Sequence, residues 1–516
     1  MFRAIAAFEL VRQVRGHVFW VVTLISFGMV LGSVGVDQLR VGVHAGGLRN
    51  GAEAIVLTHG VWTLFFMFAT AAFVADAVLR DELNGFGPVF ASAPIRRLDY
   101  RGGRFAGAFG AVLLCFASVP LGIVVGAAMP WVAPASVGPT SPAALAYAYA
   151  VIAVPNLLLS ASVGFALATV SRSLGVALVG AVALLTVYGL GARTGAALPP
   201  VLEPFGFAAY GHMIASWPPA ERDLSVPALG GLMLANRLLL LSVSAALLAF
   251  SVARGESNRP NRSRVEASAP PPVVVACAVP LFDRWTSLRQ FAARTRLEIG
   301  QTIWTPVFAA LLLLGIANAL ATLWPLRQPS AGAVVAALGG AFQLTPIVIA
   351  LFFSGELRWM EAERGVGKLL AATPLLPAAF VLPKFLAIAA VLIGTLAAAA
   401  ASATVLLAAR GQAGAAALLP GWLAGGGYDA LTFAALALFL QAIAPNKLAG
   451  WGFTVLYLIA TLTLDRLGFT DPAYRFGRYP VVEVGLSGRY HLFWALVAAC
   501  MVAAATRAAA RRTAFA

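Results

Sequence analysis

The chain has 516 residues, of which 60% are hydrophobic and only 11% are charged. A soluble domain of this size needs more charge to cover its surface, so the composition excludes one. The net charge of +15 would suggest nucleic-acid binding in a soluble protein, but here the basic residues stand between long apolar blocks. The sequence therefore predicts a membrane protein, with lipid around it and no nucleic-acid partner.

Twelve apolar blocks are long enough to cross a bilayer, which takes about 20 apolar residues per helix. The first six cover residues 17–36, 55–79, 105–129, 143–170, 175–192 and 230–252. The last six cover residues 303–324, 338–357, 385–409, 421–443, 449–465 and 490–508. The predicted fold is an all-α polytopic membrane protein with twelve transmembrane helices.

The segment 253–285 separates the sixth block from the seventh. Four arginines, Arg254, Arg259, Arg262 and Arg264, precede three consecutive prolines, Pro270 to Pro272. Such a polar, proline-rich stretch cannot bury a core and predicts a tether. We therefore divide the chain into a first half (1–252), a linker (253–285) and a second half (286–516).

Basic residues are distributed unequally between the two sides of the predicted membrane. The segments on the side of the N-terminus hold 25 of the 36 Lys and Arg residues, and the other side holds 11. The positive-inside rule therefore predicts that both termini and the linker are cytoplasmic.

The loops after the second and eighth blocks repeat one pattern without gaps. Residues 81–105 read DELNGFGPVFASAPIRRLDYRGGRF, and residues 361–385 read EAERGVGKLLAATPLLPAAFVLPKF. The matched residues are Asp81 and Glu361, Gly85 and Gly365, Ala91 and Ala371, Pro94 and Pro374, Arg104 and Lys384, and Phe105 and Phe385. Each copy has an even number of spans, so the sequence predicts two parallel six-helix repeats related by a pseudo-twofold axis along the membrane normal.

A second match precedes the first span of each half. At a shift of 284 residues, Arg12, Gly16 and Trp20 fall on Arg296, Gly300 and Trp304. The spacing from this segment to the repeated loop is nearly equal in the two halves, which favours a duplication over chance similarity.

The repeated loop is too long and too polar for a simple turn. Its acids favour a helix start, its glycine permits a left-handed conformation, and its proline redirects the chain. The base before the third span can lie at headgroup level. These features predict a short amphipathic helix at the cytoplasmic face. This helix either transmits force from a soluble partner or only orients two spans.

The second loop resembles the cytoplasmic loop of type-two ABC transporter permeases. The residues that carry this resemblance are Glu361, Arg364, Gly365, Leu369, Leu370, Thr373, Pro374, Lys384, Phe385 and Leu386. The first loop keeps Asp81, Gly85, Pro94, Arg96, Tyr100, Arg104 and Phe105. It departs from the pattern at Asn84, where the second loop has Arg364, and at Pro88 in the expected helix.

The resemblance implies further elements in each half. Residues 2–15 and 286–299 are similar to the amphipathic helix that lies along the membrane in this family. Residues 193–229 and 466–488 fit the family's outer segment between the fifth and sixth spans. These segments resemble those of bacterial permeases that are sometimes continued by a zinc aminopeptidase domain. They imply a location in the bacterial inner membrane.

Several motifs of catalysis and metal binding are absent from the sequence. No HExxH occurs, the five histidines have no metal-ligand spacing, and the three cysteines have no CxxC neighbour. No GxxxxGK[ST] occurs either, because Gly365 to Lys368 lacks the full phosphate-binding loop and is followed by Leu369. We therefore expect no enzyme activity, no metal and no cofactor on this chain.

Ionisable and amide groups inside a membrane are costly and suggest function. Asn156, Arg237 and Asp429 are the clearest cases. They either line a translocation path, or Arg237 and Asp429 pair with each other or reach water at the outer surface.

The resemblance implies a permease subunit of an ABC exporter, with ATP bound and hydrolysed by a separate cytoplasmic ABC ATPase, two copies per chain. The expected ATPase contacts are Asp81, Glu82, Gly85, Pro94, Arg104, Glu361, Glu363, Arg364, Gly365, Pro374 and Lys384. The alternatives are an ion-coupled secondary transporter and a non-transporting anchor or regulator of an ATPase. A major facilitator is disfavoured because the loop reads RDELNGFG rather than GxxxDRxGRR, and a membrane enzyme because no face gathers His, Asp and Glu.

Overall fold

The structure, a computed structural model, describes residues 1–36, 39–40, 46–193, 199–254, 283–342, 344–366, 369, 378–469 and 489–514. In these residues the regular secondary structure is entirely helical, and ten helices are long and apolar enough to cross a membrane. The predicted class, an all-α polytopic membrane protein, is confirmed. Helices suit lipid because they satisfy the backbone hydrogen bonds within one segment.

The first half begins with α1 (Phe2–Arg15), which coincides with the predicted amphipathic segment. Its long apolar helices are α2 (His17–Gly35), α3 (Ala52–Leu83), α5 (Gly103–Phe116) continued by α6 (Ser118–Ala127), α7 (Pro142–Tyr147) continued by α8 (Val154–Ser171), and α12 (Gly231–Ala253). Its shorter helices are α4 (Gly87–Ser92), α10 (Phe207–Ile214) and α11 (Pro219–Leu224). One-turn π-helices occupy Leu98–Gly102 before α5 and Ala148–Ala153 between α7 and α8.

The second half begins with α13 (Arg284–Ile303), capped by the carboxylate of Asp283. Its long apolar helices are α14 (Pro306–Leu323), α15 (Ala331–Ala341) together with α16 (Leu344–Glu363), α18 (Ala378–Ala409), α19 (Leu419–Ile443) and α21 (Arg489–Ala514). Most of the predicted linker, residues 255–282, and most of the second predicted outer segment, residues 470–488, lie outside the described residues.

The fifth predicted span of each half is also helical. These helices are α9 (Leu174–Arg193) and α20 (Lys447–Arg466), each 20 residues long. Their described apolar stretches, Leu174–Gly189 and Lys447–Thr461, end where the next side chain lies outside the description. Within the described residues, ten of the twelve predicted spans meet the length and hydropathy of a crossing helix, and the total of twelve stays a prediction.

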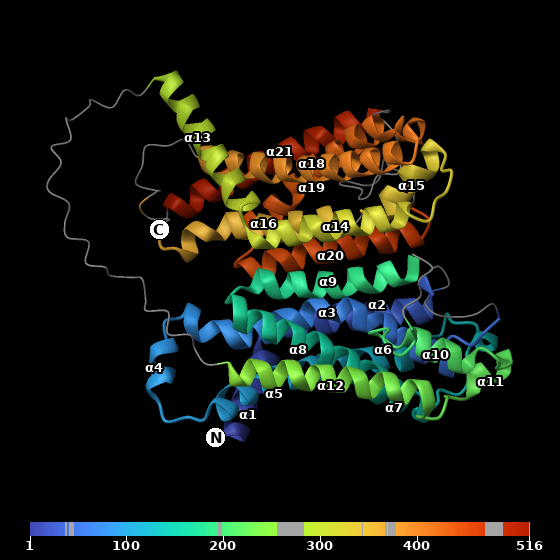
Figure 1. Cartoon of the computed structure of the whole chain (residues 1–516). Helices are drawn as coiled ribbons and strands as arrows, with labels where there is room; N and C mark the ends of the chain where they lie inside the picture. The colour runs from blue at the N-terminus through green and yellow to red at the C-terminus, as the bar shows by residue number, and fades with distance from the viewer. Residues whose placement is uncertain are drawn as a thin grey trace.

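All the long helices run between two ends of the molecule. Figure 1 shows both chain termini, α1, α4 and the start of α13 at one end, and α10, α11 and α15 at the other. We call the first the terminal end and the second the outer end. The repeated loops follow α3 and α16, and the described residues of both loops lie at the terminal end.

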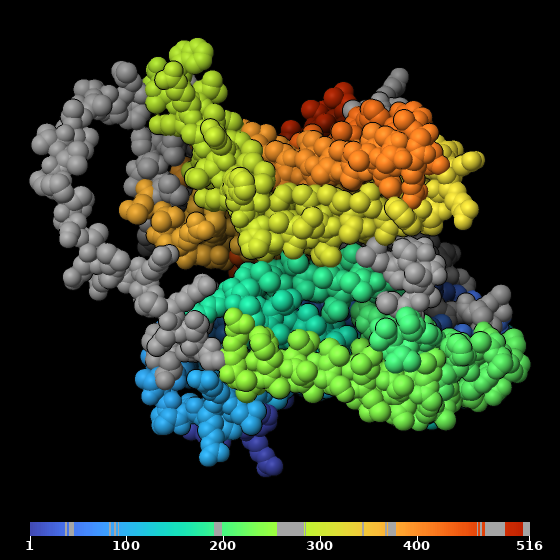
Figure 2. All heavy atoms as spheres, in the orientation of Figure 1, coloured from blue at the N-terminus to red at the C-terminus, as the bar shows by residue number. Residues whose placement is uncertain are grey.

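The two halves form two stacked blocks that meet along one boundary (Figure 2). At this boundary α9 of the first half packs against α14 of the second, and α20 of the second half packs against α2 of the first. Both contacts join the fifth span of one half to the first span of the other.

The junction between amphipathic helix and first span differs between the halves. Gly16 has extended backbone and separates α1 from α2, whereas Gly300 lies inside α13. The second junction lies at Trp304 and Thr305, where the Thr305 hydroxyl caps α14. The match of Gly16 with Gly300 is therefore wrong as a structural correspondence, because the second junction comes about one helical turn later.

Candidate functional site

The two repeated loops begin with the same helix ending. Gly85 has φ +75° and Gly365 has φ +70°, in the left-handed region that glycine adopts without strain. The amide of Phe86 donates to the carbonyl of Asp81, and the amide of Val366 donates to the carbonyl of Glu361, at 2.8 and 3.1 Å. This six-residue bond is the Schellman pattern that closes a helix C-terminus. The predicted turn at both glycines is confirmed.

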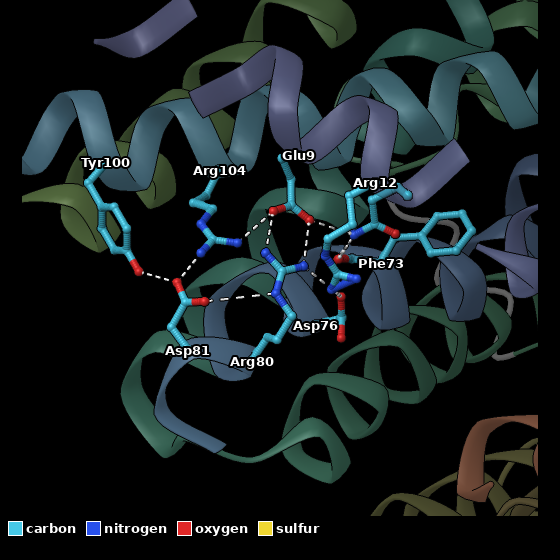
Figure 3. A network of polar contacts seen from close by, with 9 residues as sticks. Glu9, Arg12, Phe73, Asp76, Arg80, Asp81, Tyr100 and Arg104 are labelled. Atoms are coloured by element: carbon cyan, nitrogen blue, oxygen red, sulfur yellow. Dashed lines mark hydrogen bonds and ion pairs between the residues drawn. The ribbon is translucent and has the colours of Figure 1, made fainter. Parts of the chain in front are cut away.

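A cluster of ion pairs, which we call the first cluster, joins α1 to the end of α3 and the start of α5 (Figure 3). Its centre is Glu9 of α1, which is fully buried. The Glu9 carboxylate accepts from Arg80 at 2.7 Å and from Arg104 at 2.6 Å. Burial raises the pKa of Glu9, and the nearby Arg12 guanidinium opposes that shift. Arginine suits this place because its planar fork reaches two carboxylates at once.

Asp81 completes the first cluster on the loop side. It accepts from the Arg104 guanidinium and from the Tyr100 hydroxyl, and Arg12 pairs with Asp76, which lies five residues before Asp81 in α3 (Figure 3). Six charged residues are therefore joined in one cluster, three acids and three bases: Glu9, Asp76, Asp81, Arg12, Arg80 and Arg104. Their formal charges cancel, which lowers the cost of burying them.

The second half has a cluster at the matching place, which we call the second cluster. Lys384, at the start of α18, contacts Glu298 of α13 at 3.3 Å and Glu361 at the end of α16 at 3.0 Å. Arg294 of α13 also pairs with Glu361, and the Lys384 ammonium donates to the Leu357 carbonyl. In both halves a base of the third span thus joins an acid of the amphipathic helix to an acid that ends the second span.

These contacts change how four of the predicted loop residues are understood. Asp81 and Arg104 are 8% and 6% exposed, and Lys384 is 2% exposed, with their charges turned to other residues of the chain. Glu361 is engaged by Arg294 and Lys384. The sequence predicted all four as contacts to a partner, whereas the structure gives them internal partners that hold three elements together.

Other predicted loop residues are exposed or lie outside the description. Pro94 and Arg364 are exposed, and Glu363 accepts from Lys447 of α20 at 3.2 Å. The backbone of Glu82 lies in α3, but its side chain is outside the described residues, as is the whole of Pro374.

Apolar side chains are exposed in both loops at matching positions. Val89 of α4 is 61% exposed, and Leu369, which lies 280 residues later, is 72% exposed. Phe86 and Val366 form a second matched pair, also exposed. Pro88 lies in the first turn of α4, where a missing amide donor is tolerated, so this departure does not prevent the helix.

A second polar group, the outer polar cluster, lies toward the outer end of the first half. Arg237 of α12 donates to the amide oxygen of Asn156 at 2.7 Å and to the Phe205 carbonyl at 3.1 Å. The amide of Asn156 donates to Thr63 at 3.1 Å and to the same Phe205 carbonyl at 3.0 Å. Arg237 and Asn156 therefore hold the segment before α10 against α3, α8 and α12.

Asn236 and Glu203 complete this attachment. Asn236 donates to the carbonyls of Val201 and Glu203 at 2.8 Å, and the Glu203 carboxylate accepts from the amides of Phe205 and Ala208 at 2.8 and 3.1 Å. Carbonyls and amides on both sides of Glu203 thereby have side-chain partners, which irregular backbone within a membrane requires.

Asn236→Leu is expected to loosen this attachment, because three carbonyls lose their donor on α12. Limited trypsin digestion at Arg222 should become several-fold faster than in the unaltered protein, since the segment opens locally more often. Ser242→Leu, at an exposed position of α12, is the matched control and should leave the rate unchanged. Equal rates for the two variants would show that Asn236 does not hold the segment.

Asp429 lies apart from this cluster. It is buried in α19 of the second half, next to Tyr428, whose hydroxyl donates to the His491 carbonyl of α21 at 2.8 Å. The hydrogen bonds described for Arg237 go to first-half residues, so the predicted pairing of Arg237 with Asp429 is not what the structure contains.

Sequence reasoning missed the acids at the centre of both clusters. Glu9 is 0% exposed and Glu298 is 3% exposed, although each lies on a helix expected at a polar surface. A signal was present, because Glu9 is the single acid of α1 and Glu298 the single acid of α13, each among several arginines. In this protein the lone acid of each basic amphipathic helix forms an internal ion pair.

Comparison with protein-family models and with curated proteins gives no match to this chain. Among the described residues no group of three His, Cys, Asp or Glu side chains is placed to hold a metal ion.

Proposed function

We propose that this chain is the membrane-spanning permease subunit of an ABC transporter, and an exporter, in which a separate cytoplasmic ATPase binds the two repeated loops. The observation that carries the proposal is the matched exposure of Val89 and Leu369 on loops with the same helix ending. Two equivalent apolar positions at one end of the molecule favour two equivalent sites for a partner. The loop resemblance names an ABC ATPase as that partner, in two copies per chain.

We further infer that the two halves are copies of one six-helix unit. The helix endings at Gly85 and Gly365 have the same hydrogen bond, and the bases Arg104 and Lys384 occupy the same place in the two clusters. The contact of a fifth span with a first span occurs at both sides of the boundary. Parallel copies would place both loops on one side of the membrane, and the excess of arginine at the terminal end favours the cytoplasm of a bacterial inner membrane.

The clusters support a mechanical role for the loops. Because Arg104 and Lys384 each join three helices, a force applied to a loop would move the amphipathic helix and the third span together. ATP-driven closure of two ATPase copies would then move the two halves relative to each other and open a path for the substrate at the boundary.

Leu369→Asp is expected to weaken the complex with the ATPase at least tenfold, because a carboxylate would be buried against an apolar partner surface. Val89→Asp should weaken it as well. Co-purification of the tagged permease with its ATPase from membranes, followed by titration of the purified subunits, measures the effect. The matched control is Leu224→Asp, since Leu224 is 64% exposed on α11 at the outer end.

The outcomes separate the candidate functions. Equal binding by Leu369→Asp and Leu224→Asp would contradict docking at the loops. Binding without ATP-dependent transport in vesicles would favour an anchor or regulator of an ATPase. Transport that needs an ion gradient and no ATPase would favour a secondary transporter.

A further inference from the structure

The boundary between the halves is closed by apolar packing at α9. Val182 of α9 belongs to the buried core of the second half, with Leu178 and Val179 packed against that core. Figure 1 shows α9 at the edge of the first half that faces the second half. Any relative motion of the two halves must therefore change what α9 contacts.

One contact across this boundary is too close to admit a larger side chain. Phe352 of α16, 6% exposed, lies against Gly175, the second residue of α9. A methyl group added at Gly175 would overlap the Phe352 ring. Glycine at this position allows the ring of the second half to touch the backbone of the first.

The same ring continues into α20 of its own half. Phe352 and Trp451 are stacked, with ring centres 5.7 Å apart and an angle of 28° between the planes. A side chain at Gly355 would overlap Trp451, so α16 and α20 are in close contact here. Aromatic rings are rigid and flat, and a stacked pair holds its partners in one relative position.

An ion-pair group connects this stack to the second loop. The Lys447 ammonium lies 5.6 Å from the centre of the Trp451 ring. It also contacts Glu356 at 2.7 Å and Glu363 at 3.2 Å. Glu363 is the last residue of α16, two residues before Gly365. A continuous series of contacts therefore runs from the loop through Lys447, Trp451 and Phe352 to Gly175 in the first half.

We propose that Phe352 and Gly175 are positioning residues that transmit motion of the second loop to the first half. This role rests on the proposed function, since it needs a partner that moves the loop. Phe352 has no aromatic counterpart in the first half, because the residue 280 positions before it is Ala72. The second loop is thus joined to both halves, and coupling of ATP hydrolysis to motion at the boundary depends chiefly on it.

Gly175→Ala tests the contact, with Gly189→Ala on the same helix as the matched control, since a methyl group at Gly189 meets no atom within 4 Å. Thermal unfolding of the purified permease without ATPase reports the packing alone. We expect Gly175→Ala to lower the midpoint, Gly189→Ala to leave it unchanged, and Gly175→Ala with Phe352→Leu to recover part of the loss. Equal midpoints for the two alanine variants would overturn the contact.

The coupling role is tested by measuring ATP hydrolysis by the assembled complex in lipid nanodiscs, at a temperature well below the unfolding midpoint of every variant. We expect Gly175→Ala to bind the ATPase normally but to lower permease-stimulated ATP hydrolysis per complex about fivefold, the range of a typical coupling energy. The Phe352→Leu double variant should restore hydrolysis. Normal hydrolysis with a lowered midpoint would make the contact structural only and overturn the role. If the unaltered permease binds no ATPase, the proposed function and the role both fail, while the midpoints still test the contact.

Discussion

Replacing Arg104 with methionine should lower the free energy of unfolding of this protein by about 3–5 kcal/mol, the range measured when one partner of a buried ion pair is removed. Glu9 and Asp81 would both lose a guanidinium, and the first cluster would keep three acids with two bases. An unpaired charge in a buried place costs several kcal/mol more than a solvated one. Thermal unfolding followed by tryptophan fluorescence in detergent measures the change.

Two further variants test whether the loss of stability is specific to the buried ion pairs of Arg104. Arg96→Met removes an exposed arginine of the same loop and should leave the midpoint nearly unchanged. Arg104→Lys should be intermediate, since lysine keeps the charge but cannot offer two fixed donors to two carboxylates. An Arg104→Met midpoint equal to that of Arg96→Met would show that the first cluster does not stabilise the protein.

Glu361→Lys is expected to disrupt the second cluster and, as a consequence, to abolish ATPase binding. The new ammonium would lie beside Arg294 and Lys384, which both contact the Glu361 carboxylate. Three bases with the single acid Glu298 repel one another in a place from which water is largely excluded. Purified yield and unfolding midpoint should fall together with binding, whereas Leu369→Asp should weaken binding with a nearly unchanged midpoint.

A charge swap provides the internal control. Combining Glu361→Lys with Lys384→Glu restores the number of acids and bases and should recover part of the midpoint. Glu221→Lys, on exposed α11, should have little effect on either measurement. A Glu361→Lys protein with a normal midpoint and normal binding would contradict both the role of the cluster and docking at this loop.

Much of the fold was predictable because apolar length is a strong signal in membrane proteins. The order of the spans and the turns at Gly85 and Gly365 follow from local sequence, whereas the extent of α1 came from the family resemblance. Each depends on residues within one helix or one turn. The sequence was therefore sufficient to predict features that depend on residues close together in the chain.

The site was predicted only in part because its chemistry is not local. Arg104 was expected at the loop surface, yet its partner Glu9 is 95 residues earlier in the chain. Pairings of this kind depend on how helices pack, which no spacing rule contains. The contact of Phe352 with Gly175 was not predictable for the same reason. Nothing in the sequence distinguishes Gly175 from the other glycines of a chain that has 50.

The contacts of α9 and α20 have a consequence for the lipid around the protein. Both helices lie at the boundary between the halves, where α9 meets α14 and α20 meets α2. Lipid tails are as apolar as the side chains of such helices, so the halves are held together at this boundary by close van der Waals packing and not by a hydrophobic driving force. Lipid tails therefore compete with the opposite half for the same apolar surfaces, and the lipid composition of the host membrane becomes a variable that acts on the relative motion of the halves.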